Sequence, residues 1–206
     1  LTGTSEAADP ALAGMIVAQS TTALPAYAPY DSNHPLFVAE IRTTVLREST
    51  GPLDFYYQII NNNAYSVDPV GSVAIAGFSG ATADANFRTD LSGSYAPTAA
   101  SRDITASKIT FSNFPFADEL VFFPNQETNA VFVRTSATNF SDAGTIDVEF
   151  KAIISEAGRP SSSASAILPV YAPAPAGGSG VPEPTTLWLF GLAMAALVGR
   201  LKFARA

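Results

Sequence analysis

The feature that most constrains this fold is the alternation of apolar and polar residues within short segments. It is clearest in residues 145–154, where Ile146, Val148, Phe150, Ala152 and Ile154 alternate with Thr145, Asp147, Glu149, Lys151 and Ile153. Successive side chains of a strand point to opposite faces, so this period of two predicts a β-strand with one buried face. Since no segment before Val181 shows a convincing helical period, the pattern predicts an all-β domain.

The same alternation recurs between turns rich in Gly, Pro, Asn and Ser. It predicts strands at residues 12–22, 37–45, 53–61, 70–78, 85–89, 104–111, 119–123, 130–135, 145–154 and 164–171. Residues 37–45 and 53–61 form a predicted antiparallel hairpin, with Phe55 and Tyr57 facing the core and Asp54, Tyr56 and Gln58 facing outward. Short strands at this spacing predict a two-sheet antiparallel sandwich of the immunoglobulin-like or jelly-roll-like type.

The C-terminal tail has three ordered parts. Val181, Pro182, Glu183 and Pro184 come first, an uncharged apolar run over residues 185–199 follows, and Arg200, Lys202 and Arg205 end the chain. As a helix the apolar run is about 22 Å long, against a hydrocarbon core of roughly 30 Å. The run therefore predicts a single hydrophobic helix that crosses a membrane shallowly, with its basic end anchored on the cytoplasmic side.

This arrangement resembles the PEP-CTERM sorting signal of Gram-negative bacteria, although the basic cluster is interrupted where that family has a denser arginine run. The resemblance implies a membrane-embedded exosortase that recognises and processes the tail. It also implies export through an inner-membrane intermediate to the outer surface or the extracellular matrix, often with exopolysaccharide and biofilm. That route requires a signal peptide, so we expect Leu1 to be a processed or truncated start. An ordinary single-pass anchor is the alternative interpretation of the tail.

The sequence divides into four parts. We expect a frayed N-terminus at residues 1–11, a sandwich ectodomain at 12–171, a Pro/Ala/Gly linker at 172–180 and the sorting signal at 181–206. The segments at residues 51–62 and 131–140 are also similar to ectodomains found in front of PEP-CTERM tails. That similarity implies one continuous domain and no particular activity.

Charge and cysteine content limit the partners of the ectodomain. Residues 1–180 hold 8 basic and 17 acidic residues, a net charge of −9, whereas the tail has a net charge of +2. Such an acidic domain argues against nucleic acid as a partner. With no cysteine, the exported domain must be stabilised by packing and hydrogen bonds alone.

Catalytic and metal-binding patterns are weak, so we expect no catalytic site, metal or cofactor. The single histidine, His34, lies in a proline-rich loop without a triad motif around it. Asp147 and Glu149 share a strand face about 7 Å apart, within the range of glycosidase carboxylate pairs, yet charges are also ordinary on a solvent face. Asp84, Asn86, Asp118 and Glu119 supply oxygen ligands for calcium, but no loop motif organises them.

Exposed aromatic residues are the stronger indication of binding. Tyr27, Tyr30, Tyr56, Tyr65 and Tyr95 are expected at loops, turns or the outer strand face, where tyrosine suits sugar recognition. Three function classes remain: a non-enzymatic structural protein of the exopolysaccharide or biofilm, a carbohydrate-binding module, and a carboxylate-dependent glycoside hydrolase. Whether the edge strands of the sandwich pair between subunits stays open.

Overall fold

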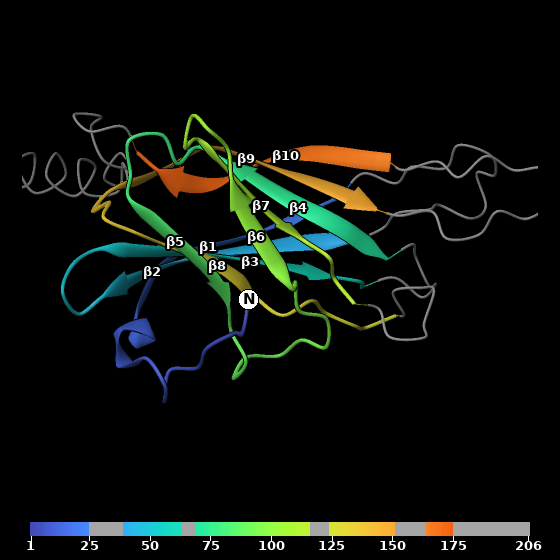
Figure 1. Cartoon of the computed structure of the whole chain (residues 1–206), viewed down its shortest axis with the longest axis horizontal. Helices are drawn as coiled ribbons and strands as arrows, with labels where there is room; N and C mark the ends of the chain where they lie inside the picture. The colour runs from blue at the N-terminus through green and yellow to red at the C-terminus, as the bar shows by residue number, and fades with distance from the viewer. Residues whose placement is uncertain (25–38, 63–68, 116–123, 151–163, 175–206) are drawn as a thin grey trace, which may run out of the picture.

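The computed structural model describes residues 1–24, 39–62, 69–115, 124–150 and 164–174. Within these residues the chain forms one short 3-10 helix, η1, and ten strands that build two antiparallel sheets (Figure 1). The elements are η1 Pro10–Leu12, β1 Gly14–Ala23, β2 Glu40–Glu48, β3 Leu53–Ile60, β4 Val70–Ala76, β5 Ala83–Phe87, β6 Ala99–Arg102, β7 Lys108–Ser112, β8 Val131–Thr135, β9 Phe140–Phe150 and β10 Ala164–Pro173. Sheet I has the order β1-β2-β3-β8-β5 and sheet II the order β10-β9-β4-β7-β6. The predicted all-β, two-sheet antiparallel architecture is confirmed.

The core lies between the inner faces of the two sheets. Sheet I contributes Ile41, Val45, Phe55, Tyr57 and Ile59, and sheet II contributes Val73, Ile75, Phe111, Ile146, Val148 and Phe150, all buried. Phe55 meets Phe78 edge to face, with ring centroids 5.9 Å apart. Burial of this apolar surface is the main force that holds the sheets together.

Strand β9 confirms the alternation from which the fold was predicted. Its inward residues Ile146, Val148 and Phe150 are buried, whereas Asp147 and Glu149 lie on the outer face. Ile146 pairs with Ile75 of β4 and with Leu168 of β10, so β9 lies between two neighbours. The strand begins earlier than predicted, at Phe140, and residues 151–154 of the prediction lie outside the described residues.

The hairpin of β2 and β3 is also confirmed, with Val45 opposite Phe55 and Thr44 opposite Tyr56. Its turn places Gly51 at a φ of 106°, in the left-handed region that glycine adopts without steric strain. The first strand of this hairpin was predicted to begin at residue 37, and residues 37 and 38 lie outside the described residues.

The prediction of one strand over residues 104–111 was correct only for residues 108–111, which lie in β7. Ile104 lies fully exposed in the loop between β6 and β7, and β6 itself was not predicted. The Asp103 carboxylate accepts hydrogen bonds from the backbone N–H groups of Ser107 (2.8 Å) and Lys108 (2.9 Å). An aspartate that binds the backbone of its own loop stabilises a turn, and this overrides the weak strand pattern.

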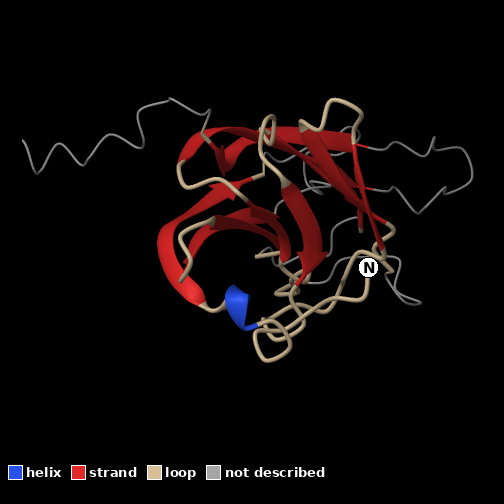
Figure 2. Ribbon diagram, turned by 60° about the vertical axis from the view of Figure 1, so that its left-hand side comes forward, coloured by secondary structure: helices blue, strands red, loops and turns tan. Residues whose placement is uncertain are grey.

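The expectation of a frayed N-terminus was wrong as well. Residues 1–13, which we call the N-terminal strap, cross the outer face of sheet I, and η1 lies beside that sheet (Figure 2). The N–H of Thr4 donates to the carbonyl of Phe87 (3.0 Å), and its carbonyl accepts from the N–H of Thr89 (2.9 Å). The low apolar content of the segment did not indicate this docking, because the docking depends on backbone hydrogen bonds, on the ionic contacts of Glu6 and Asp9, and on one buried apolar side chain, Leu12.

Docking of the strap changes the outer face of β3. All eight residues of β3 are buried, although Asp54, Tyr56 and Gln58 were predicted to face water. Leu12, Tyr56, Ala130 and Phe132 form a second, smaller apolar cluster on this face. The face is therefore enclosed, and its polar groups need partners within the protein.

Other predictions fall wholly or partly beyond the described residues. These are the strand at 119–123, most of the linker at 172–180 and the hydrophobic helix of the tail. In the part of the chain that the structure describes, no helix is long and apolar enough to cross a membrane.

Candidate functional site

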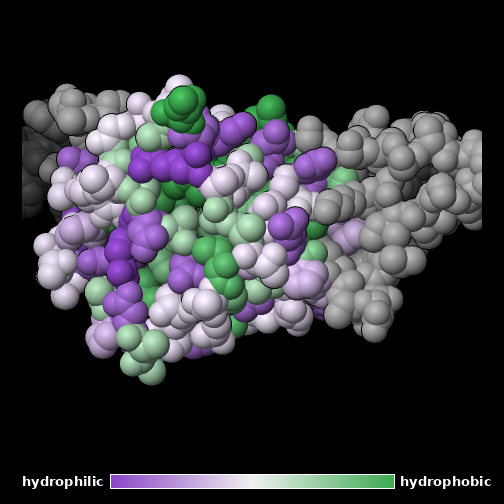
Figure 3. Space-filling model, in the orientation of Figure 1, coloured by the Kyte–Doolittle hydropathy of each residue, from purple (hydrophilic) through white to green (hydrophobic). Residues whose placement is uncertain are grey.

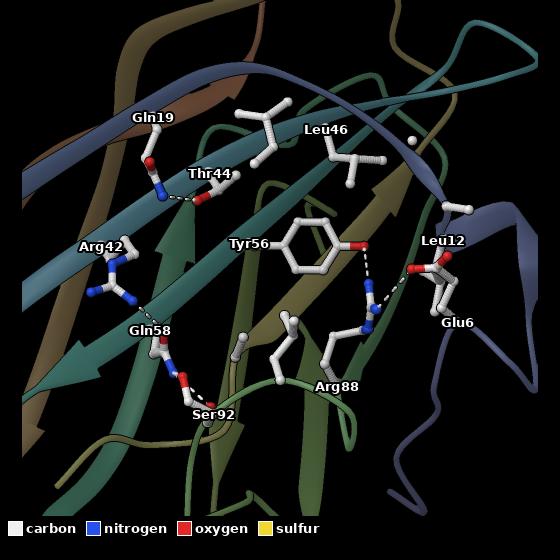
Figure 4. A pocket seen from close by; sticks show the side chains of 15 residues that line it. Glu6, Leu12, Gln19, Arg42, Thr44, Leu46, Tyr56, Gln58, Arg88 and Ser92 are labelled. Carbon is white, nitrogen blue, oxygen red and sulfur yellow. Dashed lines mark hydrogen bonds and ion pairs between the residues drawn. The ribbon is translucent and has the colours of Figure 1, made fainter.

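A hollow of about 410 Å³ lies on the outer face of sheet I, and we call it the outer-face pocket. Arg42, Thr44 and Leu46 of β2 and Tyr56 and Gln58 of β3 line it from the sheet. The remaining lining comes from the N-terminal strap, from β1, from the segment after β5 and from Ala130 just before β8 (Figure 4). A pocket of this volume is within the range of small-ligand sites in proteins.

Arg88 fixes the side of the pocket next to the strap. Its guanidinium donates to the Tyr56 hydroxyl (3.4 Å) and forms two short bonds with Asp90 (2.7 and 2.8 Å). Glu6 of the strap lies 3.7 Å from the same guanidinium. The bonds with Asp90 raise the pKa of Arg88 and hold the pKa of Asp90 well below its usual range. Burial raises the pKa of Tyr56 to about 12, so the phenol stays protonated.

Gln58 fixes the opposite side. Its amide nitrogen donates to the Ser92 carbonyl (2.7 Å), the Thr128 carbonyl (3.0 Å) and the Glu127 carboxylate (2.9 Å). Its amide oxygen accepts from Nη1 of Arg42 at 3.2 Å. The Gln58 side chain is therefore held in one orientation, and Arg42 is oriented along the pocket by it.

The pocket combines polar and apolar groups. Gln19 donates to the Thr44 hydroxyl (3.2 Å) across β1 and β2, and Arg42 is half-buried beside them. Ile16 and Leu91 contribute apolar surface and are 58% and 45% exposed. Planar hydrogen-bonding side chains next to apolar surface suit a small ligand that has both hydroxyl groups and C–H faces.

A second polar cluster lies on the same face, outside the pocket. Arg134 of β8 is 2.9 Å from Asp9 of the strap, 3.0 Å from Glu48 of β2 and 3.9 Å from Asp54 of β3. Asp54 is completely buried, and burial together with the nearby Glu48 raises its pKa to about 7. Among the described residues no cluster of three or more His, Cys, Asp or Glu is arranged to hold a metal ion.

Of the tyrosines predicted as exposed glycan contacts, the two that the structure describes are buried. Tyr56 and Tyr95 are only 5% and 6% exposed, which corrects the expectation that they lie on the surface. Tyr56 packs on Phe132 with ring centroids 5.4 Å apart, beneath the strap. Tyr27, Tyr30 and Tyr65 lie outside the described residues.

The carboxylates considered for catalysis or calcium binding are dispersed. Asp147 and Glu149 lie on the outer face of sheet II, away from the outer-face pocket, and Glu149 accepts from the Ser72 hydroxyl (2.9 Å). Asp84 and Asn86 accept hydrogen bonds from the backbone of their own strand. His34, Asp118, Glu119, the motif Val181, Pro182, Glu183 and Pro184, and the basic Arg200, Lys202 and Arg205 all lie outside the described residues.

Sequence reasoning missed most residues of the pocket. Arg42, Gln58 and Arg88 come from three different strands or strand ends, and no motif links them. One signal was available: Gln58 and Arg42 lie in strands that were predicted to pair. Once the register of the hairpin is known, the contact follows, because the structure pairs Arg42 directly opposite Gln58.

The face of the sandwich that Figure 3 shows gives no simpler indication of a partner. On the face shown in Figure 3, hydrophilic and hydrophobic residues are intermixed over the described strands and do not gather into one apolar patch. Binding is therefore better sought in a defined hollow than on a broad apolar surface.

Comparison with known proteins assigns only the tail. Residues 180–202 match the family of the PEP-CTERM protein-sorting motif. No curated protein and no solved structure matches the chain. The match covers the segment from which the resemblance was drawn and contributes nothing to the interpretation of the sandwich.

Proposed function

Because the chain carries a PEP-CTERM protein-sorting motif, which indicates a secreted protein targeted to an exosortase, we propose a non-enzymatic structural role for its sandwich in exopolysaccharide or biofilm. The exported protein passes through an inner-membrane intermediate, held by its apolar tail, and reaches the outer surface or the extracellular matrix. The single observation that carries this proposal is the motif at residues 180–202.

The position of the motif in the chain supports separate roles for the folded sandwich and for the tail. The last strand of the sandwich, β10, ends at Pro173, and the motif begins at residue 180. The segment between them includes Pro175, Gly177 and Gly178, a composition typical of an accessible tether. The proposed processing site is therefore separated from the folded domain by a few residues only.

Substitution of Glu183 tests the processing. In a host that contains an exosortase, Glu183→Ala should leave the tail attached, whereas wild-type protein loses it, as intact mass of the exported protein would show. Glu156→Ala is the matched control, since it removes an acidic residue outside the motif. Normal processing of the Glu183 variant would contradict recognition of the motif by the exosortase.

The non-enzymatic role has its own test. Turnover of an exopolysaccharide by the purified protein, lost in Asp147→Asn or Glu149→Gln, would replace this role with the glycoside hydrolase alternative. Absence of turnover in wild type and both variants is the expected result.

The outer-face pocket favours a second function, carbohydrate binding. The observation behind it is the pairing of Arg42 and Gln58 in a hollow of about 410 Å³ whose lining also includes the apolar Leu46 and Leu91. Sugars present hydroxyl groups at their edges and C–H groups on their faces, and this lining offers partners for both. Of the expected tyrosines that the structure describes, Tyr56 lines this pocket as a buried side chain, and Tyr95 does not line it.

Binding of exopolysaccharide oligosaccharides, followed by calorimetry, tests this second function. Saturable binding that weakens at least about tenfold in Arg42→Ala is expected, because a hydrogen bond from a charged group contributes about 1.5–3 kcal/mol. Lys108→Ala is the control, since Lys108 is an exposed cation of sheet II. Equal weakening in both variants would indicate nonspecific attraction to charge.

A further inference from the structure

The N-terminal strap contacts sheet I through one apolar plug and a few polar contacts. The plug is Leu12, which is 1% exposed and packs on Tyr56, Ala130 and Phe132. These three residues form what we call the apolar seat. The strap also pairs with β5 near Thr4, and it lies against the arginines of sheet I through Glu6 and Asp9. A segment held by so few buried groups has a low free energy of local opening compared with the core strands.

Glycines mark both ends of the strap. A Cβ atom added at Gly3 would lie 2.5 Å from the Phe87 ring, and one added at Gly14 would lie 2.1 Å from Cδ2 of Leu46. The backbone therefore approaches the sheet closely where the strap begins and where it joins β1. Between these points, only Leu12 inserts its side chain fully.

The ionic contact at Asp9 belongs to an unbalanced cluster. Arg134 is the cation, and it is surrounded by Asp9 on the strap, Glu48 on β2 and Asp54 on β3. On β5, Asp84 lies opposite Arg134 in the strand register. With all of its groups ionised, the contact set of Arg134, Asp9, Glu48 and Asp54 would carry a net charge of −2.

Asp54 is the least favourably placed of these acids. It is completely buried, and within the described part of the chain no N–H or O–H group donates to its carboxylate oxygens; the side chain that interacts with it as a hydrogen-bonding neighbour is another acid, Glu48. A buried carboxylate without hydrogen bonds is strongly disfavoured in its charged form. Desolvation and repulsion from Glu48 and Asp9 outweigh the attraction of Arg134 and raise its pKa to about 7.

We propose that the N-terminal strap is a displaceable cover coupled to Asp54: it stays docked on the apolar seat while the Asp54 carboxyl is neutral and opens when that carboxyl ionises. Opening removes Asp9 from the cluster and admits water to Asp54, so the charged form is stabilised in the open state. The neutral acid is correspondingly favoured in the docked state, where it lies buried beside Glu48.

The sign of the effect follows from proton linkage. The charge of Asp9, which belongs to the strap, is one of the causes that raise the pKa of Asp54, so by this proposal the docked strap binds the proton more tightly than the open strap does. The stabilisation of the docked state by protonation is therefore fully present at low pH and is lost as pH rises through about 7. Alkaline conditions open the strap, and mildly acidic conditions close it.

Opening also changes the outer-face pocket. Leu12, Ala13 and Gly14 line the pocket and are the last residues of the strap and the first of β1. Their displacement would widen the hollow and expose the apolar seat. This device requires no particular ligand, so it does not depend on the carbohydrate-binding function.

Hydrogen exchange on the full 206-residue chain in a nonionic detergent tests the proposal. The reporting amides are those of Thr4, bonded to Phe87, and Leu12, bonded to the Asp9 carbonyl. After correction for intrinsic exchange, their protection should fall about tenfold between about pH 6 and pH 8.5, since one proton is linked to opening. Amides of β8 and β9 should keep their protection, which separates strap opening from global unfolding.

Two variants make the test decisive. Asp54→Asn keeps the size of the side chain and removes its charge, so strap protection should become independent of pH. Glu48→Gln removes the neighbouring charge that raises the pKa of Asp54, so the opening midpoint should move to lower pH. The proposal is overturned if Asp54→Asn keeps the wild-type pH dependence, or if Glu48→Gln leaves the midpoint unchanged. If Asp54→Asn does not fold, the Glu48→Gln midpoint decides alone.

Discussion

The Tyr57 hydroxyl donates a hydrogen bond of 2.6 Å to the backbone carbonyl of Tyr171 and so joins the two sheets. Tyr57 belongs to β3 of sheet I and is 1% exposed, whereas Tyr171 belongs to β10 of sheet II. Burial raises the pKa of Tyr57 well above its ordinary value, so the phenol remains a donor at any physiological pH. A polar contact thus links the layers inside a largely apolar interface.

Tyr57→Phe should destabilise the domain by about 1 kcal/mol, because the Tyr171 carbonyl loses its donor while the packing volume is kept. Urea unfolding of variant and wild type measures the difference. Tyr171→Phe is the matched control, since it removes a hydroxyl and leaves the bonded carbonyl in place. Equal stability of Tyr57→Phe and wild type would mean that water replaces the lost donor.

Leu12→Ala should open the N-terminal strap without unfolding the sandwich. Truncation of a buried leucine costs about 2–5 kcal/mol, and here that loss is limited by the free energy with which the strap docks. We expect faster proteolysis within residues 1–13 and little change in the global unfolding midpoint. Leu91→Ala, at a side chain that is 45% exposed, should change neither. A large drop in the global midpoint would show that the strap is part of the main cooperative unit.

The two hydrogen bonds between Arg88 and Asp90 predict that the stability of the domain depends on pH in the acidic range. Arg88 holds the pKa of Asp90 well below its usual range, so the pair stabilises the fold above the unfolded pKa of about 3.9 and loses this effect as pH falls further. Asp90→Asn should therefore lower the thermal midpoint at neutral pH, and the difference from wild type should shrink below about pH 4. Asp142→Asn, at an exposed position of β9, serves as control. A difference that stays constant with pH would exclude the charge as its cause.

Gly144 of β9 allows close packing against β10. A Cβ atom there would lie 2.5 Å from Cβ of Ala172 and 3.0 Å from the Val170 carbonyl oxygen. Gly144→Ala should destabilise the domain by about 1–3 kcal/mol through overpacking. Ala172→Gly in the same chain should recover part of this loss, because it removes the closer of the two contacts. A double-mutant cycle measures that recovery, and strictly additive losses would refute the steric explanation.

Much of the fold was predictable because strand alternation is a local property. The inward residues of β9 and the hairpin of β2 and β3 follow from a period of two and a turn, and both are confirmed. The sorting tail was recognisable for a related reason, since its motif, apolar run and basic end follow one another directly in the chain.

The candidate site was not predictable in this way. Tyr56 was placed on a solvated face, but it is covered by Leu12, which precedes it by 44 positions in the chain. The partners of Arg88 likewise include Tyr56 and Glu6, which are distant in sequence. No local pattern encodes such contacts.

By itself, the sequence determined that this chain is built of strands, which side chains face the core in its clearest strands, and where its sorting signal lies. Tertiary structure alone decided that the N-terminal residues cover sheet I, that Asp54 is buried beside Arg134, and that a pocket forms at Arg42 and Gln58. The physical reason is the range of the interactions. Alternation and turn chemistry act between residues a few positions apart, whereas burial and charge pairing depend on which distant segments the fold brings together.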